Sequence, residues 1–134
     1  MADTGNLFGN TVMKTVLCDS DLSAKQYYLV NLDSSDDNVV NLASAATSVP
    51  FVLTEGAAGS ASSPKACSIA LGGRAKVVLG GTIGAGVPFM SDASGKAVVA
   101  TNGKYSAGIL LKGGVAGDIV ECLVTPGRVW TTVS

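Results

Sequence analysis

The residues that most often perform catalysis are scarce in this sequence. Histidine is absent, which removes the commonest general base near neutral pH, the Ser-His and Cys-His nucleophile pairs and the usual ligands of catalytic zinc. The adjacent acids Asp36 and Asp37 fit a solvated turn better than a catalytic pair of carboxylates. The sequence therefore predicts a protein that is not an enzyme, with no cofactor and no metal site.

Two short motifs imitate known sites without their context. GGTIGAG, residues 80–86, is as rich in glycine as a phosphate-binding loop, but no helical pattern follows it and no Gly-Lys-Ser/Thr closes a Walker motif. Residues 62–65, SSPK, have the Ser-x-x-Lys form of some acyl-transfer enzymes but lack the companion motifs. Corner formation by glycine is the better explanation of the first motif.

The three cysteines, Cys18, Cys67 and Cys122, are odd in number and widely spaced. No disulfide framework or zinc motif follows from such spacing. Cys67 and Cys122 stand inside apolar runs, where a free cysteine behaves as a small buried hydrophobic residue.

Composition limits the partners. Charged residues make up 14% of the chain and hydrophobic residues 47%, whereas about a quarter of a typical globular chain is charged, so we expect a surface covered by a partner. A net charge of −1 argues against non-specific nucleic-acid binding, which needs many basic residues.

Apolar runs stay below the roughly 18 residues of a membrane helix, and the N-terminus lacks the pattern of a secretion signal. We therefore expect synthesis in the cytoplasm and no membrane partner.

Charge is unevenly distributed along the chain. Up to Pro64 there are seven acids and two bases, and from Lys65 onward there are three acids and seven bases. If the two halves form different faces, the molecule is dipolar and a complementary field could orient it on a partner. If the halves interleave in the fold, the charges cancel.

The order of apolar runs and glycine-rich breaks predicts an all-β fold. Branched residues favour pleated strands, and glycine supplies the positive φ of tight connections. We expect a single compact antiparallel β-sandwich or barrel-like domain, with a flexible surface loop at 56–64 and turns at Gly72-Gly73 and Pro126-Gly127. The expected strands are 12–17, 26–32, 38–42, 50–54, 66–71, 75–79, 87–90, 96–101, 105–111, 119–124 and 128–133. The expected structural corners are Gly80, Gly81, Gly84, Gly86, Gly113, Gly114, Gly117 and Asp118.

Residues 1–11 are set apart from the β domain, 12–134. They are polar except for Leu7 and Phe8, so they form either a frayed terminus or an arm that orders on a neighbouring protein through these two anchors. Trp130, near the other end, fits a core or interface anchor.

A loose repeat is also visible. The segments EGAAG at residue 55, GGTIGAG at residue 80 and GGVAG at residue 113 are alike. Glycine and alanine are so common in this chain that coincidence is the favoured explanation.

From residue 79 onward, the order of motifs resembles a known family. GGTIGAGVPFMSD, then GKAVVAT, then SAGILLKGGVAGDIVECLVTPG resemble the tailed-phage capsid decoration, or cement, proteins. The shared elements are the segments 84–87, 94–97, 108–111 and 116–120, and the likeness extends roughly over residues 19–127.

This resemblance implies a structural virion protein. It would bind the major capsid protein on the outer surface of the head as a homotrimer at three-fold positions and stabilise the head. Its place would be the exterior of the virion, after synthesis in the host cytoplasm. One alternative is a β module that binds a small ligand or glycan through Trp130 or the tyrosines, and a third option is a hydrolase with an unusual histidine-free site.

Overall fold

A computed structural model describes residues 11–44, 49–101 and 103–129. Nine strands occupy these ranges, and the all-β prediction is confirmed. The described residues contain no helix with the length and apolar character needed to cross a membrane. The strands are β1 (Thr11–Cys18), β2 (Leu29–Leu32), β3 (Val39–Leu42), β4 (Pro50–Glu55), β5 (Lys65–Val78), β6 (Pro88–Ser91), β7 (Ala97–Val99), β8 (Tyr105–Leu110) and β9 (Ile119–Val129).

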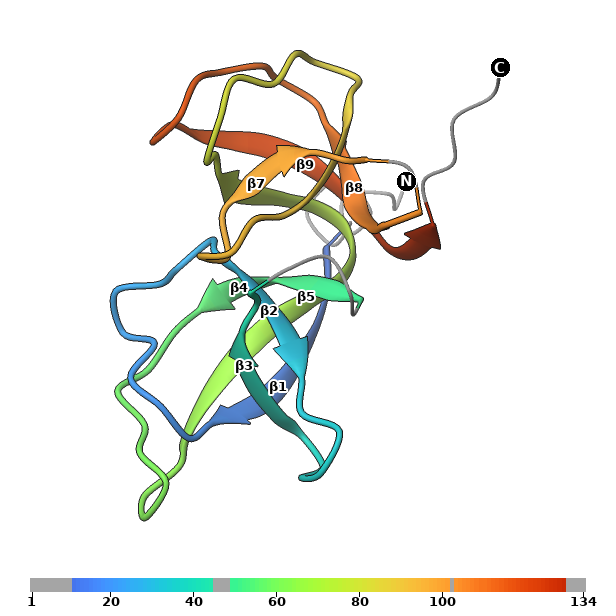
Figure 1. Ribbon diagram of the computed structural model, residues 1–134. Coiled ribbons are helices and arrows are strands. Elements are labelled where there is room, and N and C mark those ends of the chain that lie inside the picture. The colour runs from blue at the N-terminus through green and yellow to red at the C-terminus, as the bar shows by residue number, and fades with distance from the viewer. Residues whose placement is uncertain (1–10, 45–48, 102, 130–134) are drawn as a thin grey trace, which may run out of the picture.

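The first lobe, residues 11–70, is a closed five-stranded barrel. Its strands follow the order β1-β3-β2-β4-β5, and β5 pairs back with β1. All of these pairs are antiparallel except β1 with β3, where Leu17 lies opposite Val39. Figure 1 shows this barrel as the lower half of the molecule, with β5 rising from it.

The second lobe, residues 71–129, repeats this arrangement. The second half of β5 pairs with β9, and β8, β6 and β7 follow in order. A parallel bridge between Leu79 and Ala97 brings the start of β7 beside the residue that follows β5. The parallel pairing of β1 with β3 is the corresponding contact in the first lobe. Because β5 pairs with strands of both lobes, it is the last strand of the first lobe and the first strand of the second.

Local contacts show that the chain is internally duplicated. In the first lobe, the amide of Leu22 donates to the carbonyl of Ala57 (2.8 Å); in the second, Ile83 donates to Gly114 (3.1 Å). Positive φ angles close the equivalent hairpin turns, 64° at Asn38 and 79° at Gly95. The repeat is thus a doubling of the whole lobe.

The glycine-rich segments take their places from this duplication. EGAAG and GGVAG occupy equivalent corners of the two lobes, whereas GGTIGAG packs against GGVAG through the bridge between Ile83 and Gly114. Two of the three segments thus stand at equivalent corners of the repeated lobes, which coincidence does not explain, and the third is a different connection.

Two predicted turns are wrong because the strands continue through them. β5 passes through Gly72-Gly73, where φ of Gly73 is 86°; neighbouring strands hold both halves, so the glycines bend the strand instead of reversing it. β9 passes through Pro126-Gly127. Ser106 lies opposite Arg128 and Gly108 opposite Val124, so the intervening residues of β9 form a bulge.

The predicted strand 26–32 is also shorter than expected. Tyr27 has a φ of 70°, and Tyr28 donates its amide to the carbonyl of Lys25 (3.0 Å), so these tyrosines belong to a turn before β2. Leu29 and Val30 are both fully buried. They point to opposite faces of β2, and each face covers a different core.

The two cores meet at the shared strand. The barrel core comprises Val16, Cys18, Leu22, Val30, Val40, Leu53, Cys67 and Ile69. The larger core comprises Leu29, Ala43, Val52, Ala70, Val77, Leu79, Ile83, Phe89, Ala97, Ala107, Leu110, Val120, Cys122 and Val124. The first four of the larger core come from the first lobe, so the outer face of the barrel is packed into the second lobe.

The loop 56–64 lies on the surface as predicted, but its first half is not free. A Cβ on Gly56 would collide with the carbonyl oxygen of Leu22, and a Cβ on Gly59 with that of Cys18. Ser60 and Ser63 exchange two backbone hydrogen bonds of 3.1 Å at the tip. The prediction of a flexible loop therefore overlooks close packing on the barrel.

Candidate functional site

The predicted anchors lie beyond the described residues. Leu7, Phe8 and Trp130 fall in 1–10 and 130–134, outside the described ranges. The predicted boundary between the arm, residues 1–11, and the β domain lies at the start of β1, where Thr11 is opposite Gly73. These anchors remain predictions, and the described surface belongs to the two lobes.

The predicted corner residues gather at two neighbouring connections. Gly80, Gly81, Gly84 and Gly86 lie between β5 and β6, and Gly113, Gly114, Gly117 and Asp118 lie between β8 and β9.

The second of these connections is tightly built. A Cβ on Gly114 would come within 2.8 Å of the Asp118 carboxylate. This carboxylate accepts the amide of Val115 at 2.9 Å and so closes the turn.

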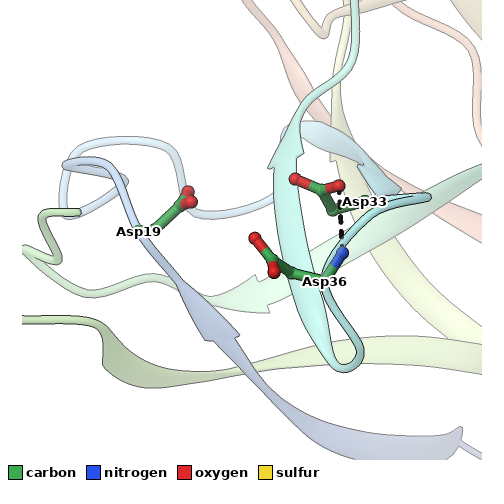
Figure 2. A group of neighbouring side chains, drawn as sticks. All are labelled: Asp19, Asp33 and Asp36. Carbon is green, nitrogen blue, oxygen red and sulfur yellow. Dashed lines mark hydrogen bonds between the residues drawn. The ribbon is translucent and has the colours of Figure 1, made fainter.

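Three carboxylates cluster at the far end of the first lobe. Asp19 follows β1, and Asp33 and Asp36 belong to the turn between β2 and β3; one oxygen of each lies within 4.8 Å of the others. Figure 2 shows the carboxylates of Asp19 and Asp36 facing each other, with Asp33 above Asp36 and hydrogen-bonded to its amide. Carboxylate oxygens are ligands for hard cations.

Hydrogen bonds at Asp33 assign it a structural task. Its carboxylate accepts the amides of Ser35 (2.7 Å) and Asp36 (3.3 Å) and the side-chain amide of Asn41 (3.1 Å). The amide of Ser35 and then the side chain of Asn41 are the main causes that lower the pKa of Asp33. The cluster is therefore first of all an acidic turn, as expected for Asp36 and Asp37.

Two of the three thiols, those of Cys67 and Cys122, are unsuited to nucleophilic chemistry. Cys18, Cys67 and Cys122 are free and buried, as expected for Cys67 and Cys122. Burial raises the pKa of the Cys67 and Cys122 thiols to about 12. Both therefore stay protonated near neutral pH, and a protonated thiol is a poor nucleophile.

The described tyrosine with charged neighbours is Tyr28. The Nζ atoms of Lys25 and Lys96 lie 4.9 Å and 6.0 Å from the centre of its ring. The contact with Lys96 joins the turn before β2 to the second lobe, whereas Lys25 belongs to the same turn as Tyr28. They occupy a ring that a glycan-binding module would use for stacking.

Charge is separated between the lobes. Residues 11–70 carry six carboxylates and three lysines, whereas residues 71–129 carry three carboxylates and six basic side chains. Because these ranges are the two lobes, the first lobe has a net negative formal charge and the second a net positive one, which is the arrangement that the dipolar alternative requires.

Large apolar side chains are exposed at two places of interest. Val12 and Met13, at the start of β1, adjoin residues 1–10, which are outside the structure. Leu111 and Val115 lie on the connection between β8 and β9, and Ile119 is the first residue of β9.

Comparison with known proteins gives a likeness of fold. No protein-family model and no curated protein matches the sequence. A crystal structure of the N base of head fiber gp8.5 from bacteriophage phi29 is similar, with a TM-score of 0.64 and 18% identity. The alignment covers 86% of this chain and 94% of that chain. The chain therefore has the fold of the base of a phage head fiber.

Proposed function

We propose that this protein is a structural component of a phage virion, without enzymatic activity, that binds the outer surface of the head and stabilises it. The observation that carries the proposal is the fold shared with a head-fiber base over nearly the whole length of both chains. The low content of charged residues supports it, because a surface with few charges loses little solvation when a partner covers it.

The proposed mechanism is attachment through many weak contacts. A homotrimer at a three-fold position would present each surface three times to the major capsid protein, and avidity would replace high affinity at a single site. Each subunit then bridges neighbouring capsid proteins and resists their separation under internal pressure.

Co-sedimentation tests the proposal directly. Purified protein and phage heads that lack it are mixed at several salt concentrations and separated on a gradient, and we expect the protein to move with the heads. Absence of binding at every salt concentration would overturn the proposal. Light scattering gives the oligomeric state, with three times the 13.3 kDa chain mass expected for a trimer.

Deletion of residues 1–10 tests the arm. The truncated protein should keep its fold, because the described strands begin at Thr11, and should bind heads more weakly. Equal affinity of the truncated and full chains would reject a binding role for Leu7 and Phe8.

A further inference from the structure

We propose that residues 4–8 fold back on their own chain and pair with the free edge of β1 as a further strand, joined to β1 by a two-residue turn at Gly9-Asn10. Residues 1–10 lie outside the described ranges, whereas the edge that would receive them is described. The pairing does not depend on binding to phage heads, so it holds or fails separately from the proposed function.

One edge of β1 lacks a strand partner over the first half of the strand. β1 pairs with β5 from Thr11 to Cys18, but β3 pairs with β1 only at Leu17 and Cys18. In the described part of the chain, no further strand pairs with β1. On the β3 side, residues 11–15 therefore present backbone N–H and C=O groups that another strand could bind.

The direction of these backbone groups is known from one hydrogen bond. The amide of Leu17 donates to the carbonyl of Asn38 (2.7 Å), so the backbone groups of Leu17 point to the β3 side. Direction alternates along a strand, and the register shift near Val12 places its extra residue in β5 and not in β1. The backbone groups of Thr11, Met13 and Thr15 therefore point to the free edge.

Gly9-Asn10 has the composition of the turn that this edge requires. A Gly-Asn pair before a strand is typical of a type II′ hairpin turn, whose first position needs the positive φ that glycine adopts readily. In a two-residue hairpin the flanking residues, here Phe8 and Thr11, bond to each other. The direction of the Thr11 backbone groups meets this condition.

The length of the segment also fits. Counting back from the turn places Asn6 opposite Met13 and Thr4 opposite Thr15. The new strand ends before Leu17, where β3 begins to pair with β1. Residues 4–8 therefore fill the free edge without displacing β3.

The segment carries apolar side chains that match those exposed on β1. Val12 and Met13 are 56% and 58% exposed. In the proposed register, Leu7 lies opposite Val12 on one face of the sheet, and Phe8 lies diagonal to Met13 on the other face. Each of the two exposed side chains thus gains an apolar neighbour.

Covalent continuity favours the chain's own segment over another molecule. The segment leads directly into the free edge, so pairing closes a loop of two residues, and a short loop costs little entropy of closure. The same segment of a second copy would also lose the translational freedom of a separate molecule. A capsid protein would then meet the outer edge of the new strand instead of β1.

Amide hydrogen exchange measured by NMR on the full chain tests the pairing. The amides of Met13 and Thr15 face the free edge, whereas those of Lys14 and Val16 face β5. All four should be protected in the full chain. Deletion of residues 1–8 should speed exchange at Met13 and Thr15 by roughly tenfold or more and leave Lys14 and Val16 unchanged.

Two glycine substitutions form a matched pair. Gly9→Val places a branched residue where the turn needs a positive φ, and it should remove the protection of Met13 and Thr15. Gly5→Val places the same residue within the new strand, opposite Lys14, where branched residues are favoured, and the protection should remain. Circular dichroism checks that the β domain of each variant is folded.

Three results would overturn the pairing. The first is fast exchange of Met13 and Thr15 in the folded full chain, and the second is equal exchange in the two glycine variants. The third is a nuclear Overhauser contact between Leu7 and Val12 that joins a labelled copy to an unlabelled one, because the segment would then bind a second molecule. Co-sedimentation of the wild type with heads tests the proposed function separately.

Discussion

Leu29→Ala is expected to destabilise both lobes together. Leu29 belongs to β2 of the first lobe and is fully buried, yet it packs in the core that contains Phe89 and Leu79. Its amide donates to the carbonyl of Gly95 in the turn between β6 and β7 (2.7 Å). The residue thus joins the barrel to the second lobe.

The expected cost follows from the atoms removed. Three buried carbons at about 0.8 kcal/mol each give about 2.4 kcal/mol, and the remaining cavity raises the total to about 3–4 kcal/mol. Whole domains are stable by about 5–15 kcal/mol, so the midpoint of urea unfolding should fall strongly. Leu32→Ala, on the same strand but exposed, should change stability by less than about 0.5 kcal/mol.

Hydrogen exchange resolved by peptide during urea unfolding provides the assay. Peptides from β3 and from β8 should lose protection at the same urea concentration in the wild type, and at the same lower concentration in Leu29→Ala. Loss of protection in the first lobe alone, with the second lobe unchanged, would refute the cooperation between the lobes.

Three further outcomes are expected. Gly108→Ala should prevent or strongly impair folding, because the new Cβ would collide with the carbonyl group of Leu123, whose carbon would be 3.0 Å away; soluble yield and circular dichroism measure this. The pKa of Asp33 is lowered in the folded protein. The ionised carboxylate therefore stabilises the fold above the unfolded pKa of about 3.9, and this contribution is lost as the pH falls through the folded pKa. Asp33→Asn should reduce this loss of stability in acid, as measured by thermal melts. Native Cys67 and Cys122 should resist a thiol reagent at pH 8 and react after unfolding, because the pKa of each is raised to about 12.

Local chemistry made most of the strands predictable. Alternation in the run 119–124 matches β9, where Val120, Cys122 and Val124 face the core, and the acidic turn before residue 38 joins β2 to β3 as expected. Long-range pairing was not predictable in this way. Gly72-Gly73 has the composition of a turn, and only the strands on both sides of β5 make it a bend.

The candidate surface was predictable in part. Counting charges revealed the acidic and basic halves, but their separation in space depends on β5 dividing the chain into two lobes. The parallel pairing of β1 with β3 brings Asp19 close to Asp33 and Asp36. A pairing between strands this far apart in the chain has no local sequence pattern that would predict it. Val115 belongs to a glycine-rich corner in sequence, and its exposure follows only from the fold.

The shared strand β5 restricts how such a protein could have arisen. A half-length chain ending at residue 64 would lack the strand that closes its barrel against β1 and β4. An ancestor of one repeat would have had to obtain that strand from a second copy, as in a domain-swapped dimer. Gene duplication with fusion would then have replaced an exchange between molecules by a continuous chain, freeing each repeat to change separately.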